Sequence, residues 1–139
     1  MTNNARIFND FLKKQNLNLN FIDGDDGKTL LEINETLDGG IKVRICVIFD
    51  TDEKLIGIYA FDFIGGINPT KRSYLLDLLN EINSKYTYIK FVMNQDSIEV
   101  RSFSLFNNNF EPSVIMQMIF NVMDAIKEDY SNIMRIMWS

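Results

Sequence analysis

Residues 41–49 place the tightest limit on what this chain can fold into. Apolar and other residues alternate along it, with Ile41, Val43, Ile45, Val47 and Phe49 on one side and Lys42, Arg44, Cys46 and Ile48 on the other. A period of two with one apolar side is typical of a half-buried β-strand. The segments Asp38-Gly39-Gly40 and Asp50-Thr51-Asp52-Glu53 predict tight turns at its two ends. Strands joined by tight turns are antiparallel, so we expect an antiparallel sheet around this strand.

Four further strands and three helices complete the predicted order. Strands are predicted over residues 28–36, 54–64, 86–93 and 97–105, and an acidic turn over 23–27. Apolar residues at helical spacing predict helices over 4–14, from Asn68-Pro69 to about Lys85, and from Ser113 to about Ile136. The order is α-β-β-β-α-β-β-α, without an internal repeat or linker. We predict a single α+β domain, residues 1–139, with an antiparallel sheet covered by helices.

The composition restricts the chemistry. The chain contains no histidine, which removes the commonest general base, the Ser-His and Cys-His dyads and most zinc sites. Cys46 is the one cysteine, so no intrachain disulfide can form. The net charge of −5 is opposite in sign to that of a typical phosphate-backbone binder. We therefore predict a protein that is not an enzyme, with no cofactor, no metal and no nucleic-acid partner.

The N-terminal segment and the hydropathy pattern predict a location. Asn9, Asp10, Lys13 and Lys14 interrupt any apolar stretch that could serve as a signal peptide. No window approaches the roughly 18 uncharged apolar residues that a spanning helix needs. We expect a cytoplasmic protein with no membrane association.

Four segments resemble a known family. They are Phe8 to Leu12, Ile45 to Asp50, Leu78-Leu79-Asn80-Glu81-Ile82-Asn83, and the long methionine-rich last helix. Together with the order of the elements, they resemble the YbjN family of small bacterial proteins, which are classed as sensory transduction regulators and share the fold of type III secretion chaperones. The resemblance covers nearly the whole chain. It implies a chaperone-like α+β fold, often dimeric, with a binding or regulatory role, and it carries over no active site.

The last helix has two apolar stripes. The first contains Ile115, Ile119, Val122, Ile126, Ile133 and Met137 and is sufficient to dock the helix on a sheet. The second contains Met116, Phe120, Met123, Tyr130 and Met134 and lies about 90° around the helix. Together they cover about half of the circumference, more than a helix packed on one side needs. Either the second stripe is an interface, as methionine-rich faces often are, or the first helix or the C-terminal tail covers it.

Charged side chains on the strands offer a second candidate site. Lys42, Arg44, Lys90 and Arg101 are predicted on strands, and Asp62 interrupts the apolar strand 54–64. Arg44, Asp62 and Arg101 are candidates for a ligand site, although a solvated sheet face with cross-strand ion pairs explains them equally simply. We predict a non-enzymatic adaptor of chaperone-like or regulatory type that captures a segment of a protein partner on an apolar groove or an exposed sheet edge. We also predict a homodimer, with the second stripe of the last helix as the candidate interface. The alternative is a small-ligand sensor or an enzyme at the charged sheet face.

Overall fold

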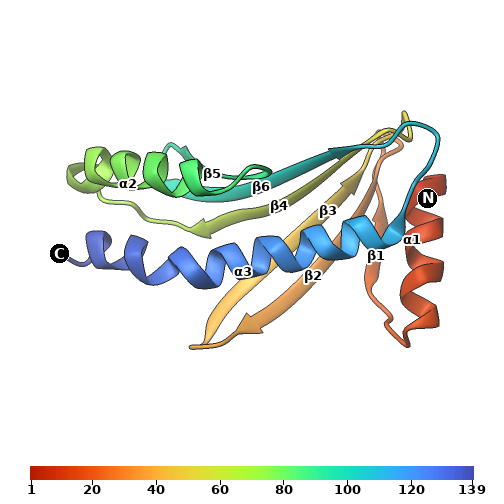
Figure 1. Ribbon diagram of the computed structural model, residues 1–139, viewed down its shortest axis with the longest axis horizontal. Helices are drawn as coiled ribbons and strands as arrows, with labels where there is room; N and C mark the ends of the chain where they lie inside the picture. The colour runs from red at the N-terminus through yellow and green to blue at the C-terminus, as the bar shows by residue number, and fades with distance from the viewer.

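The computed structural model describes all 139 residues of the chain as three α-helices, one short 3-10 helix and six strands (Figure 1). In chain order they are α1 (Asn3–Lys14), β1 (Asn20–Asp23), β2 (Thr29–Leu37), β3 (Ile41–Phe49), β4 (Leu55–Ile64), η1 (Pro69–Lys71), α2 (Arg72–Lys85), β5 (Ile89–Asn94), β6 (Ser97–Leu105) and α3 (Pro112–Met137). None of the helices has both the length and the apolar character needed to cross a membrane.

All six strands form one antiparallel sheet, in the order β1-β2-β3-β4-β6-β5. The predicted α+β fold is therefore confirmed, with one strand added. That strand, β1, pairs with β2 from Asn20 opposite Glu32 to Asp23 opposite Thr29. It has only four residues, too few to show alternation in the sequence. The predicted strand 86–93 begins later, at Ile89, and residues 86–88 lie outside the ladder.

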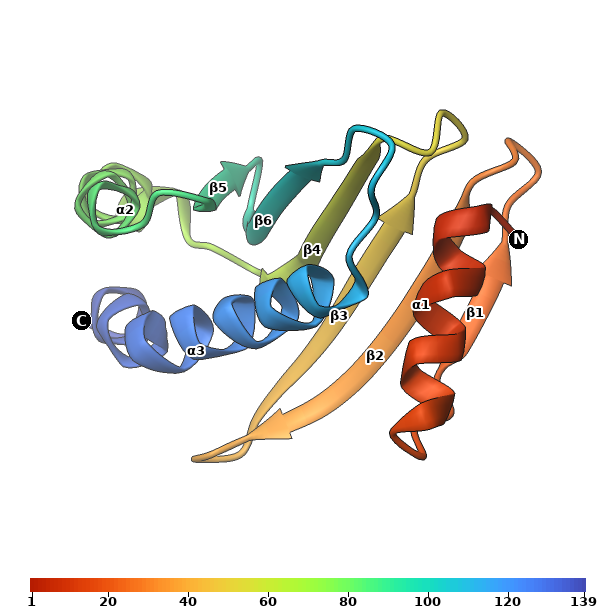
Figure 2. The same ribbon diagram turned by 45° about the vertical axis from the view of Figure 1, so that its right-hand side comes forward.

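The three helices cover one face of the sheet. The ladders place Leu31 opposite Val47 and Val47 opposite Ile58, and all three side chains are fully buried on this face. The Phe8 ring of α1 packs 6.0 Å from the ring of Phe49, which points to the same side as Val47. Figure 2 shows α1 and α3 crossing in front of the sheet, with α2 beside β5. The core therefore lies between this face and the three helices.

The ladder between β3 and β4 is short. Its register runs from Cys46 opposite Tyr59 to Phe49 opposite Ile56. Further along β4 an irregularity lies between Ala60 and Ile64, where Asp62 adopts a φ of 46°. The two strands then diverge, and α3 lies across the opening in contact with both (Figure 1). The apolar side of α3 thus packs against β3 and β4 where these two strands no longer pair with each other.

The other face of the sheet carries no helix. Three aromatic side chains gather there: the Tyr59 ring stacks on Phe61 at 4.6 Å and meets the edge of Phe103 at 5.5 Å. The Tyr59 ring covers Gly57 closely, since a Cβ at position 57 would lie 2.7 Å from the ring and would displace it. Phe61 and Phe103 remain 39% and 43% exposed. The domain therefore has one face covered by helices and one open face with an aromatic cluster.

Candidate functional site

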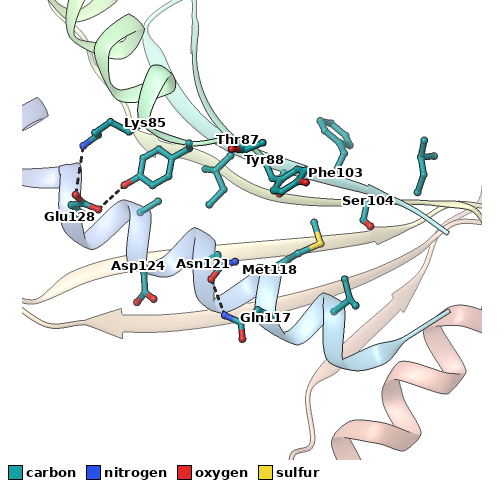
Figure 3. Close-up of a pocket in the computed structure, with 16 residues that line it drawn as sticks. Lys85, Thr87, Tyr88, Phe103, Ser104, Gln117, Met118, Asn121, Asp124 and Glu128 are labelled. Carbon is teal, nitrogen blue, oxygen red and sulfur yellow. Dashed lines mark hydrogen bonds and ion pairs between the residues drawn. The ribbon is translucent and has the colours of Figure 1, made fainter.

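The largest cavity is a half-open groove of about 820 Å³ between β6 and α3. One wall is formed by the residues that precede β5 and by the end of β6, and the other by α3 (Figure 3). The groove lies on the helix-covered side of the sheet, where α3 moves away from β6. Its volume is within the range of about 300–1,000 Å³ that is usual for binding sites.

The wall on α3 is a third stripe of that helix, distinct from the two predicted ones. Its members recur at spacings of four and three residues: Val114, Met118, Asn121, Ala125 and Glu128. Ile115, Ile119 and Val122 pack into the core, and this contact turns their neighbours towards the groove. Met118 is half-buried, and its side chain extends towards the β6 wall (Figure 3).

The wall on the sheet contains an unpaired strand edge. β5 pairs with β6 only as far as Ile89 opposite Ser102, which leaves Phe103–Leu105 without a partner on that side. The Phe106 N–H donates to the Lys54 carbonyl, 2.8 Å away, on the β4 side. Because backbone groups alternate along a strand, Ser104 also faces β4, and Phe103 and Leu105 direct their N–H and C=O groups to the other side. No backbone hydrogen bond outside the ladders involves either residue. Tyr88 precedes Ile89 and lies beside Phe103 there, with its carbonyl 2.8 Å from the Ser102 hydroxyl, so the open part of the edge is at Leu105.

A buried carboxylate lies at one end of the groove. The Asp129 side chain is fully buried, and Lys85 Nζ lies 2.7 Å from its Oδ1. The Tyr86 hydroxyl lies 2.9 Å from both Asp129 Oδ2 and Glu128 Oε2 and donates its proton to one of them at a time. The hydrogen bond to Asp129 raises the pKa of Lys85. Burial, followed by the two carboxylates, raises the pKa of Tyr86. At neutral pH the cluster therefore keeps an ammonium and a protonated phenol.

The groove has a negative rim. Asp124 and Glu128 line it from α3 and are exposed. Lys85 is the one cation in the lining, and its closest charge contact is Asp129, at 2.7 Å, with Glu128 farther away at 3.8 Å. Two carboxylates thus lie within 4 Å of one ammonium, Asp124 adds a third negative charge to the lining, and the remaining charge attracts cations.

The three residues of the charged sheet face do not form one site. The Arg44 guanidinium pairs with Glu32 across the β2–β3 ladder, with Nε 3.5 Å from Oε2. Arg101 pairs with Glu99 along β6, with Nη2 2.9 Å from Oε2. Asp62 is exposed at the irregularity in β4, and no ion pair or hydrogen bond links it to either arginine. The Arg44 pair is therefore a cross-strand ion pair of a solvated sheet face, whereas the carboxylate of the Arg101 pair, on Glu99, is buried.

The second stripe of the last helix is partly covered by the chain itself. Met116, Met123, Tyr130 and Met134 are half-buried against the core. The Tyr130 ring, for example, lies 6.3 Å from that of Phe63 on β4. Phe120 is the exception and is 52% exposed. The exposed part of this stripe is therefore centred on Phe120.

Sequence reasoning did not single out Lys85, Tyr86 or Asp129. One signal was available, because Asp129 lies seven residues after Val122 and four before Ile133, on the first apolar stripe. A charged residue at a core position requires a buried partner. The partners lie 44 and 43 residues away in the sequence, and only the packing of α2 against α3 identifies them.

No family model, no curated protein and no solved structure matches this chain. In the structure, no group of three or more cysteine or acidic side chains is close enough to hold a metal ion. The groove therefore has to be interpreted from its own geometry.

Proposed function

We propose that this protein is a non-enzymatic adaptor that captures a segment of a partner protein in the groove between β6 and α3. The observation that carries the proposal is an unpaired strand edge beside a partly apolar groove, at Phe103–Leu105. Unpaired strand edges are templates for another chain. We also propose a regulatory, chaperone-like role in the cytoplasm, and a homodimer in which Phe120 and its neighbours on the second stripe form the contact.

The side chains of the groove suit a peptide. Met118 provides an unbranched, polarisable surface that adapts to different partners. Val114 and Ala125 extend this apolar strip along α3. A partner segment that buries an apolar side chain against this strip gains about 25 cal/mol for each Å² removed from water.

The alternative function, a small-ligand sensor, finds some support in the volume of the groove. The polar groups of the lining favour the adaptor, because several are already engaged within the chain. The Ser102 hydroxyl donates to the Tyr88 carbonyl at 2.8 Å, and the Gln117 amide donates to Asn121 Oδ1 at 2.9 Å. These engaged groups leave few side-chain donors for a polar ligand.

Selection from a random peptide library by the immobilised protein tests the proposal. Peptides that bind the wild type are then measured against Met118→Arg, in which a long cationic side chain fills the groove. Met123→Arg is the matched control, since it makes the same change at a half-buried methionine of the same helix outside the groove. We expect at least a tenfold loss of affinity for Met118→Arg alone. Equal losses in two variants that circular dichroism finds folded, or no selected peptide, would refute capture in the groove.

A further inference from the structure

We infer that the groove binds an extended, apolar segment followed by basic residues, which joins the sheet as a strand beside β6. The inference rests on the proposed function and specifies the partner. Its first support is the backbone N–H and C=O of Leu105, which face the open edge beyond Tyr88. Addition of a strand to such an edge is an established mode of peptide recognition, in which the main chain provides the affinity and pockets provide the specificity.

The direction of the added segment is set by the existing ladder. β5 runs antiparallel to β6 from Ile89 opposite Ser102, so a segment that continues this line begins opposite Leu105 and runs towards Tyr88. Residues opposite each other in a ladder point to the same face. The segment's residue opposite Ser104 therefore points to the helix-covered side, towards Met118. An apolar residue is required at the position opposite Ser104.

The charge of the groove selects the residues that come after the apolar stretch. After the residue opposite Ser104 the segment meets Tyr88, which lies beside Phe103, and it has to leave the sheet edge along the groove. Asp124 and Glu128 line the groove there, on the stretch of α3 that leads to Asp129 (Figure 3). Opposite charges across an interface guide association and fix the register. The end of the segment therefore carries lysine or arginine.

The same charges argue against a second copy of this chain as the occupant. A copy that paired through its own Phe103–Leu105 edge would add its Asp124 and Glu128 rim to the acidic rim of the first. The chain also has a net charge of −5, so the two copies repel each other at low salt. A cationic partner has neither disadvantage.

The test uses the capped hexapeptide acetyl-Thr-Val-Thr-Val-Lys-Lys-amide, with acetyl-Thr-Val-Thr-Val-Glu-Glu-amide as its matched control. NMR hydrogen exchange follows the backbone amide of Leu105 in the full chain. We expect this amide to exchange at least tenfold more slowly with the lysine peptide at saturation. The glutamate peptide is expected to bind at least tenfold more weakly.

Two variants at one exposed position separate backbone pairing from side-chain contact. Leu105 is 77% exposed, and its N–H faces away from β4, so proline is tolerated there as at other strand edges. Leu105→Pro removes one donor and should abolish binding of the lysine peptide, whereas Leu105→Ala should keep it. If Leu105→Pro does not fold, the exchange data on the wild type decide.

The possible results distinguish strand addition from the proposed function, capture of a partner segment in the groove. Equal binding of the two hexapeptides, or binding of the lysine peptide without protection of the Leu105 amide, overturns strand addition. If library peptides still lose affinity for the Met118→Arg variant, capture in the groove remains supported without strand addition. Protection of the Leu105 amide that grows with protein concentration alone identifies a second copy as the occupant and overturns the inference. If neither a library peptide nor the lysine hexapeptide binds, both proposals are refuted.

Discussion

Removal of the Asp129 charge and removal of the Lys85 charge are expected to change the free energy of unfolding by very different amounts. The Asp129 carboxylate is fully buried, whereas the Lys85 side chain is 45% exposed. Lys85→Met leaves a buried carboxylate with the Tyr86 hydroxyl as its only remaining hydrogen-bond partner. Asp129→Leu removes the buried charge and leaves an ammonium that water and Glu128 can still reach. The two substitutions break the same ion pair but leave different groups uncompensated.

The magnitudes depend on this difference in burial. Removal of one partner from a fully buried pair costs about 3–5 kcal/mol, and the exposure of Lys85 lowers our expectation for Lys85→Met to roughly 2–3 kcal/mol. Asp129→Leu loses two hydrogen bonds to a charged group, worth roughly 1.5–3 kcal/mol each. It regains the desolvation cost of the carboxylate, several kcal/mol, and about 1.5–3 kcal/mol from a buried leucine. We expect a net change within about 1 kcal/mol.

Urea denaturation at pH 7, followed by circular dichroism, measures the free energies of unfolding of both variants and of the double variant. The double variant should recover most of the loss caused by Lys85→Met, with a coupling of about 2 kcal/mol, since it removes the buried charge that Lys85→Met leaves unpaired. A loss for Asp129→Leu equal to that for Lys85→Met would show that burial of the carboxylate is not the source of the asymmetry. A double variant less stable than Lys85→Met would refute the reasoning outright.

Three further predictions concern pH, the core and the second stripe. The pKa values of Lys85 and Tyr86 are raised above their ordinary 10.5 and 10.0. Their contribution to stability is therefore complete below pH 10 and is lost above it, and denaturation midpoints of Tyr86→Phe should decline less between pH 10 and 11 than those of the wild type. Leu79→Ala should cost about 2–5 kcal/mol by urea denaturation and Leu78→Ala less, because Leu79 is buried and Leu78 half-buried; equal costs would contradict the packing of α2. Phe120→Glu should leave the fold intact, since the side chain is 52% exposed, and light scattering should find only monomer if the second stripe mediates self-association; an unchanged mass argues against that interface.

The order of the elements could be predicted because its signals are local. Alternation over residues 41–49 and the turn segments at both ends fixed the direction of the strands, and the structure reproduces the bounds of β3 and β6. Asn68-Pro69 marked a helix start, and the Asn68 side chain accepts the Thr70 N–H there. The strand β1 was missed, because its four residues take their β conformation from the ladder with β2 rather than from their own pattern.

The groove could not be predicted, because it depends on a contact between distant segments. Tyr86–Tyr88 have the aromatic character of a strand, and the sequence placed them in one. In the structure Tyr86 leaves the sheet edge to reach Asp129 on α3, and the strand starts three residues later. That displacement opens the edge at Phe103–Leu105. A local pattern indicates the β-propensity of Tyr86, but it does not show that the Tyr86 hydroxyl forms a hydrogen bond with a buried carboxylate on α3.

The short ladder between β3 and β4 divides the molecule into two parts that are each continuous in sequence. Residues 3–49 supply α1 and β1 to β3, and residues 55–105 supply β4, α2, β5 and β6. Four pairs of residues join the two parts within the sheet, and α3 contacts α1 and β3 on one side and β4, β6 and α2 on the other. Native proteins open in contiguous cooperative units, and we expect each part to be one such unit. Because α3 packs on both parts, we expect its undocking to replace one unfolding transition by two.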